Sequence, residues 1–106
     1  MKSFVVRKFF SPEYRENRLR QGVGQVGTPM KSQDKEALRK AHLDYLGKLK
    51  DEGKIFCGGP LTDWTWAMDI YRADSEEEVE GLLAADPFAQ SGIFSHHEIK
   101  EWFQAF

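Results

Sequence analysis

The side chain with the clearest potential for chemistry is His42, an imidazole on the apolar face of an expected helix. The helix is predicted from about Ser32 to Glu52, and its apolar face is formed by residues at helical spacing around His42: Leu38, Tyr45, Leu46 and Leu49. A polar ring on such a face is costly unless a partner hydrogen-bonds it. A supported imidazole can act as a general acid or base, whereas the structural alternative is a core histidine that donates one hydrogen bond.

The other reactive side chains have ordinary structural interpretations. His96 and His97 are adjacent in the expected last strand, so they point to opposite faces and do not form a shared chelate. No spaced set of ligands predicts a metal site, and no cofactor is expected. Cys57 is the only cysteine, which is typical of a reducing cytoplasm. It lies in an apolar strand that is expected to be buried, so we interpret it as a small hydrophobic residue.

Length and charge restrict the class of protein. The 106 residues are enough for one domain, residues 1–106, and no stretch resembles a membrane span or a signal peptide. Residues 1–31 carry seven Lys/Arg and two Glu, whereas the rest of the chain carries eight Lys/Arg and fifteen acidic residues. This balance lacks the strong basic excess of a nucleic-acid binder. The basic first third could still attract a small anion.

The expected elements alternate as β-α-β-β-α-β. Strands are predicted at about residues 2–10, 54–58, 66–72 and 93–101, with helices at about 32–52 and 76–85. This order is typical of an α+β, ferredoxin-like fold with an antiparallel four-stranded sheet. Two helices cover only one face of such a sheet, and the other face also carries large apolar residues. We therefore expect a homodimer formed through the open sheet face.

The segment 11–31 is predicted to be a long loop insertion. Loops of this length in compact domains are usually functional lids or disordered insertions. The segment includes Gly22-Val23-Gly24-Gln25-Val26-Gly27, which matches the dinucleotide fingerprint G-x-G-x-x-G. That fingerprint requires a strand directly before it and a helix opening within it. Here Thr28-Pro29 follows instead, so the sequence does not predict a nucleotide site.

A family resemblance rests on a pattern that extends through most of the chain. The pattern consists of His42, Leu46, Leu49, Gly53-Lys54-Ile55, Gly58-Gly59-Pro60-Leu61, Asp86-Pro87-Phe88 and Gly92. It resembles the YciI-like (YCII-related) family. The resemblance implies a dimeric α+β barrel with a His–Asp dyad, which corresponds here to His42 and Asp86. The alternative for Asp86 is structural, because Asp followed by Pro commonly begins a helical turn.

Three further residues are candidates for binding a substrate. Arg7 could hold an anionic or phenolate oxygen, or it could form a salt bridge at the rim of the sheet. Gly59 and Pro60 form a predicted turn in which the backbone can approach a ligand closely.

These observations predict a small cytoplasmic enzyme that acts on a small polar or aromatic metabolite. Its chemistry would be general acid–base catalysis of the isomerase, lyase or dehydrohalogenase type, without a metal or an organic cofactor. The resemblance includes one enzyme that removes chloride from a chlorinated hydroquinone, but most members of the family have no assigned reaction. The alternatives are a non-catalytic protein that binds a small molecule and a domain that serves chiefly for dimerisation.

Overall fold

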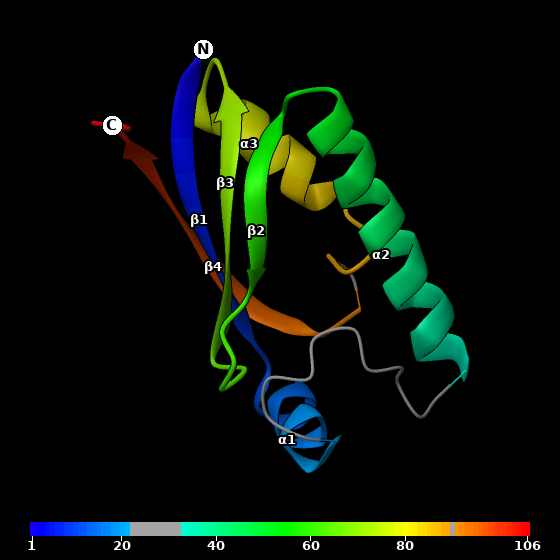
Figure 1. The fold of residues 1–106 in the computed structure, drawn as a ribbon. Helices are drawn as coiled ribbons and strands as arrows, with labels where there is room; N and C mark the ends of the chain where they lie inside the picture. The colour runs from blue at the N-terminus through cyan, green and yellow to red at the C-terminus, as the bar shows by residue number, and fades with distance from the viewer. Residues whose placement is uncertain (22–32, 90) are drawn as a thin grey trace.

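The computed structural model describes residues 1–21, 33–89 and 91–106 (Figure 1). Its elements, in chain order, are β1 (Lys2–Phe10), α1 (Pro12–Gln21), α2 (Gln33–Asp51), β2 (Ile55–Pro60), β3 (Trp66–Ala73), α3 (Glu76–Ala84) and β4 (Phe94–Trp102). The order matches the expected β-α-β-β-α-β succession, with α1 as an additional helix. None of the helices in these ranges is both long enough and apolar enough to cross a membrane.

The four strands form one antiparallel sheet in the order β2-β3-β1-β4. β1 pairs with both β3 and β4, so that Val6 lies opposite Asp69 on one side and Ile99 on the other. Helices α2 and α3 pack against one face of the sheet, while α1 lies near the end where β1 finishes (Figure 1). The predicted α+β, ferredoxin-like fold is therefore confirmed.

Helix α3 begins as the sequence predicts. The hydroxyl of Ser75 accepts a hydrogen bond from the backbone N–H of Glu78 at 3.2 Å. The Glu78 carboxylate accepts in return from the backbone N–H of Asp74 at 2.9 Å, one residue before the usual partner in a capping box. Helix α2 ends at a glycine, because Gly53 adopts a left-handed φ of 76° that non-glycine residues rarely adopt. These local signals fix where α3 begins and where α2 ends.

The segment after β1 differs from the predicted loop, because Pro12–Gln21 form helix α1. Proline is favourable in the first turn, and the Ser11 hydroxyl accepts from the backbone N–H of Tyr14 at 3.3 Å as an N-cap would. The helix has few apolar residues, so its sequence lacks the periodicity that revealed α2. The glycine-rich stretch at 22–27 lies outside the described residues.

Strand β2 also differs from its prediction. It continues through Gly59 and Pro60, which were expected to form a turn. Cys57 is exposed rather than buried. The physical reason is that β2 is an edge strand whose register shifts between Ile55 and Cys57, so only its first residue is buried in the core.

The buried side chains form two hydrophobic clusters. The first lies between the sheet and helices α2 and α3, and it comprises Phe4, Val6, Leu49, Ile55, Tyr71, Ala73, Val79 and Leu83. The second lies towards α1 and the loop between β2 and β3, and it comprises Phe10, Tyr14, Trp64, Ala67, Phe88 and Ile93. The opposite sheet face is only partly covered in the single chain, and Phe56, Met68 and Trp102 are exposed.

Candidate active site

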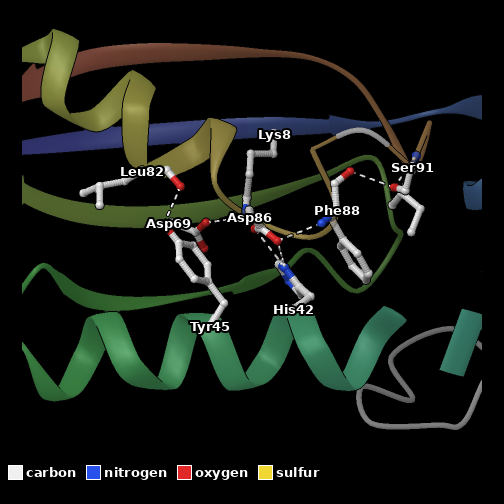
Figure 2. Close-up of polar contacts among 9 residues, drawn as sticks. Lys8, His42, Tyr45, Asp69, Leu82, Asp86, Phe88 and Ser91 are labelled. Carbon is white, nitrogen blue, oxygen red and sulfur yellow. Dashed lines mark hydrogen bonds and ion pairs between the residues drawn. The ribbon is translucent and has the colours of Figure 1, made fainter. Parts of the chain in front are cut away.

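Four buried polar side chains separate the two hydrophobic clusters, and we call them the polar layer: Lys8, His42, Asp69 and Asp86. Their exposed fractions are 4%, 8%, 2% and 5%, respectively. They come from β1, α2, β3 and the turn after α3 (Figure 2). Along each segment, the polar residue falls between a neighbour from the first cluster and one from the second: Val6 and Phe10, Tyr45 and Leu38, Tyr71 and Ala67, Leu83 and Phe88. Buried charged groups require partners, and these four are arranged in two pairs.

The first pair joins His42 to Asp86. The Nδ1 atom of His42 lies 2.7 Å from Oδ1 and 2.9 Å from Oδ2 of Asp86 (Figure 2). Oδ1 also accepts from the backbone N–H of Phe88 at 2.9 Å, so Asp86 shapes its own turn and holds the imidazole at the same time. The Phe88 ring stacks on the imidazole with centroids 3.9 Å apart and planes 6° apart. The carboxylate assigns the proton of the neutral imidazole to Nδ1 and leaves Nε2 as the nitrogen that can exchange a proton.

His42 lines a cavity of about 80 Å³. The other lining residues are Phe10, Tyr14, Arg18, Arg39, Leu43, Pro60, Trp64 and Phe88. Among the hydrogen bonds of the described residues, none involves His42 Nε2. Among the described residues, the lining contains two guanidinium groups and no carboxylate, so the cavity favours an anionic ligand over a cationic one. Helix α1, which supplies Tyr14 and Arg18, forms one wall of the cavity.

The second pair joins Lys8 to Asp69, with 2.5 Å between Lys8 Nζ and Asp69 Oδ2. The Lys8 ammonium also lies 5.0 Å from the centroid of the Phe94 ring. Gly58 on the neighbouring strand leaves room for this pair, because a Cβ atom at that position would lie 2.0 Å from Asp69 Oδ1. The pair therefore depends on glycine at a place where backbone and carboxylate approach closely.

A larger cavity of about 360 Å³ lies along α3 and the start of β4. Lys8, Asp86, Phe94 and His97 are among the residues that line it, but His42 is not. His97 contacts Glu80 at its rim, with 3.0 Å between Nε2 and Oε2. This volume lies within the usual range for small-molecule sites, whereas the smaller cavity falls below it. The smaller cavity is nevertheless the better candidate for chemistry, because it is lined by the imidazole with the unbonded nitrogen.

The structure distributes the predicted site residues between two regions. Pro60 lines the cavity beside His42, whereas Arg7 and Gly59 do not. Arg7 lies on the other sheet face, where it forms an ion pair with Glu98 and its guanidinium lies 5.3 Å from the Phe9 ring centroid. Successive side chains along a strand point to opposite faces of the sheet. Because Lys8 is buried on the face covered by α2 and α3, Arg7 points to the opposite face. This placement agrees with the alternative that Arg7 forms a salt bridge.

The cavity residues that the sequence did not identify include Arg18, Arg39 and Trp64, whose side chains carry N–H donors. A signal existed for Arg39, which precedes His42 by three residues and therefore lies on the same helix face. Arg18 belongs to the helix that was expected to be a loop, and nothing in the sequence marks Trp64. Across the described ranges, no group of three or more His, Cys, Asp or Glu side chains is arranged to hold a metal ion.

Two tyrosines lie next to the polar layer. The Tyr45 hydroxyl donates to the backbone carbonyl of Leu82 at 2.7 Å and so links α2 to α3 (Figure 2). Burial, followed by the nearby charges of Asp86 and Glu52, raises the pKa of Tyr45 above its ordinary value of 10.0. Burial and the charge of Asp69 raise the pKa of Tyr71 in the same way. Both phenols are therefore held in the neutral form.

Comparison with known proteins identifies the family. The sequence model of the YCII-related domain matches residues 14–103, which is most of the chain. The chain belongs to the YCII-related family. Within this family, the chain is 38% identical to the uncharacterized protein YjpA of Bacillus subtilis (strain 168) over 61 residues, covering 58% of this chain and 71% of YjpA. It is 28% identical to the protein YciI of Escherichia coli O6:H1 over 80 residues, covering 66% of this chain and 82% of YciI.

A solved structure similar to this YCII-related chain is that of an enzyme. It is the 5-chloro-2-hydroxyhydroquinone dehydrochlorinase TftG from Burkholderia phenoliruptrix AC1100, in complex with 2,5-dihydroxybenzoquinone. The two structures align with a TM-score of 0.67 and 25% sequence identity, over 97% of this chain and 95% of TftG. The predicted membership of the YciI-like family is thus confirmed, and the fold is that of a known small-molecule enzyme.

Proposed function

We propose that this protein is an enzyme that transfers protons on a small molecule, with His42 as the general acid–base and Asp86 as its support. The observation that carries the proposal is the geometry of one imidazole. Its Nδ1 is held by Asp86 at 2.7 Å, while its other nitrogen makes no hydrogen bond among the described residues and the ring lines a cavity. A histidine that served only the core would have no need of a cavity with cationic walls.

In the proposed mechanism, Asp86 keeps the proton of the neutral ring on Nδ1, and Nε2 removes a proton from the substrate. The ring then carries a positive charge, which the Asp86 carboxylate stabilises, and Nε2 returns the proton to another atom or passes it to a leaving group. Phe88 holds the ring plane by stacking. A general acid–base of this kind contributes roughly 10²- to 10⁴-fold to the rate.

The reaction class that we propose is isomerisation, elimination or dehydrohalogenation. TftG has the same fold and is a dehydrochlorinase, which supports an enzyme of this type. The cavity constrains the substrate, because its volume of about 80 Å³ is below the roughly 150 Å³ that accommodates a benzene ring in an engineered protein cavity. We therefore expect the reacting end of a small polar molecule to enter, with any ring extending towards the opening.

The test compares turnover of 5-chloro-2-hydroxyhydroquinone and of a panel of small enolisable acids by wild type and by two variants. We expect His42→Ala and Asp86→Asn to lose about 10²- to 10⁴-fold in kcat/KM. Two matched controls, His97→Ala and Asp44→Asn, change an exposed histidine and an exposed aspartate on α2, and they should retain turnover. Thermal melting of every variant reports whether it is folded. Full activity of folded His42→Ala would exclude the proposed role.

One observation favours a second candidate, a protein that binds a small molecule without turning it over. The cavity beside His42 is small, which suits the retention of a ligand as well as its conversion. In that case wild type would bind molecules of the panel, as measured by the rise in melting temperature, and would convert none of them. His42→Ala would then weaken binding without any change in a rate.

We also propose that the protein is a homodimer joined through the open sheet face. The exposed side chains of Phe56, Met68 and Trp102 on or beside that face support this assembly. Sedimentation should give twice the mass of the chain, and Met68→Lys should shift the equilibrium towards monomer. A cytoplasmic location belongs to the same proposal, because a single exposed thiol suits a reducing compartment.

A further inference from the structure

Trp64 has a buried polar group for which the fold supplies no partner. The residue is 4% exposed, and its indole Nε1 is buried without a hydrogen bond among the described residues. A buried indole N–H normally finds an acceptor, because an unmade hydrogen bond in the interior is costly. Trp64 lines the same cavity as His42. The missing acceptor is therefore expected among molecules that enter this cavity.

The backbone at Trp64 is held in a conformation that bulky residues rarely adopt. Its φ of 59° is in the left-handed region, and the described part of the chain contains no other non-glycine residue with positive φ. The loop around it is well fixed: Asp63 Oδ1 accepts from both the backbone N–H and the hydroxyl of Thr65, and the Arg15 guanidinium donates to the Asp63 carbonyl. These bonds from Thr65 to Asp63 lower the pKa of the Asp63 carboxyl, which therefore stays ionised as an acceptor. Strain that the surroundings impose so firmly is typical of functional positions.

The cavity walls indicate which kind of acceptor fits. The Arg18 guanidinium lies 4.9 Å from the centroid of the Trp64 ring, and Arg39 also lines the cavity. None of the described lining residues is acidic, although Arg39 forms an ion pair with Glu36 on its own helix, with 3.4 Å between Nη1 and Oε1. The Asp86 carboxylate lies beyond the imidazole, bound to Nδ1. Positive surroundings favour an acceptor that carries negative charge, and hydrogen bonds to such acceptors are the strong ones.

We propose that the Trp64 indole N–H binds and orients an anionic oxygen of the molecule on which His42 acts. The inference relies on the proposed function for its site and names the chemistry of its substrate: a small molecule with a carboxylate or a phenolate oxygen. That oxygen is placed between the indole N–H and the guanidinium groups, which brings an adjacent C–H or O–H group to His42 Nε2. Trp64 is thus a binding residue that determines specificity for oxyanions.

The experiment uses the indole N–H signals of the uniformly ¹⁵N-labelled protein. The chain has three tryptophans, Trp64, Trp66 and Trp102, and the Trp64→Phe variant assigns the signal of Trp64 by its loss. Three probes are titrated separately: propionate as a carboxylate, 4-nitrophenolate as a phenolate, and nitrobenzene as an uncharged ring. We expect one of the two anions to move the Trp64 signal far more than the Trp66 or Trp102 signal, while nitrobenzene leaves it in place.

The affinity of the anion should fall about tenfold or more in Trp64→Phe, which keeps an aromatic ring and loses the donor. His42→Ala separates this inference from the proposed function, because the anion should still move the Trp64 signal when the acid–base is absent. A shifted Trp64 signal in a protein without turnover would support the inference and contradict the enzyme. If neither anion moves the Trp64 signal, the inference is wrong, whether or not wild type is an active enzyme.

Discussion

The two ionic pairs of the polar layer are equally buried but differ in what they leave unsatisfied. In the Lys8–Asp69 pair, which joins two neighbouring strands, an ammonium contacts a carboxylate at 2.5 Å. In the His42–Asp86 pair, which joins a helix to a turn, the carboxylate binds one ring nitrogen, the other has no hydrogen bond among the described residues, and the residue lines a cavity. Burial and a charged partner are therefore not enough to mark a reactive group. A nitrogen without a partner beside open space is the distinguishing feature.

The elements that supply the partners explain this difference. β1 and β3 are locked in register by backbone hydrogen bonds, so Lys8 and Asp69 have fixed positions, and the Asp69 carboxylate occupies the space left at Gly58. Asp86 instead lies in a turn in which the backbone N–H of Phe88 binds its carboxylate, and it contacts His42 only at Nδ1. The two strands yield a pair in which the charged atoms contact each other directly, whereas the helix and the turn yield a pair that leaves one ring nitrogen without a hydrogen bond among the described residues.

The largest expected change in stability tests whether the Lys8–Asp69 pair, called the strand pair because it joins β1 to β3, has a structural role. The same change, Asp to Asn, is made at both carboxylates. Asp69→Asn leaves the Lys8 ammonium buried without its counter-ion and should lower the free energy of unfolding by about 3–5 kcal/mol. Asp86→Asn should cost about 1–2 kcal/mol, because its partner His42 can remain neutral. Urea unfolding at one protein concentration measures both losses.

A double variant provides the control for this comparison. Lys8→Met with Asp69→Leu replaces the whole pair by apolar residues, and it should recover most of the stability that Asp69→Asn loses. Turnover by the refolded double variant should persist, since neither residue contacts the smaller cavity. Equal losses at Asp69 and Asp86, or a double variant as unstable as Asp69→Asn, would contradict the distinction between the pairs.

An intermediate loss of stability is expected for substitution of Gly58, which leaves room for the Asp69 carboxylate of the Lys8–Asp69 pair. Alanine there would place Cβ 2.0 Å from Asp69 Oδ1 and 3.1 Å from the Met68 carbonyl oxygen. Because Lys8 holds the Asp69 carboxylate, the clash is expected to cost about 1–3 kcal/mol of unfolding free energy. Gly59→Ala is the matched control on the same strand, where no atom lies within 4 Å of the new Cβ. Thermal or urea unfolding in which the two variants behave alike would show that the close approach at Gly58 is unimportant.

The smallest expected loss of stability is that of a substitution at Tyr45, which lies close to the His42–Asp86 pair. Tyr45→Phe removes the hydrogen bond to Leu82 and should cost about 1 kcal/mol at neutral pH. Because the pKa of Tyr45 is raised in the folded protein, its contribution is complete below the ordinary value of 10.0 and is lost as the pH rises above it. The stability difference between wild type and Tyr45→Phe, measured by urea unfolding, should therefore shrink above pH 10.0. A constant difference would indicate that the phenol is not held neutral by the fold.

Much of the architecture could be predicted from local pattern. The helical spacing around His42 located α2 and its inward face, and the order of strands and helices led to the ferredoxin-like sheet. Alternation along β1 puts Lys8 on the same face as Phe4, Val6 and Phe10, and the structure shows it buried there. Helix α1 could not be found in this way, because a helix with so few apolar residues has little apolar periodicity.

The residues that line the cavity could not be predicted from local pattern, because they come from segments that are distant in the chain. Arg7 and Lys8 are adjacent cations, and only the packing of α2 and α3 on one face decided which of them is near the polar layer. Trp64 is an ordinary aromatic residue in the sequence, and its left-handed backbone depends on loop bonds that reach as far as Arg15. No local pattern encodes these contacts.

By itself, the sequence determined helices α2 and α3, the four strands, their order and the presence of one imidazole on an apolar face, because these follow from residue spacing within single elements. The family resemblance implied that Asp86 pairs with His42, whereas the tertiary structure alone decided that Lys8 and Asp69 form a separate pair and that Arg18, Arg39 and Trp64 line one cavity. The physical reason is that a hydrogen bond or a cavity wall depends on positions in space, and residues 44 apart in the chain, as His42 and Asp86 are, meet only when the core has formed.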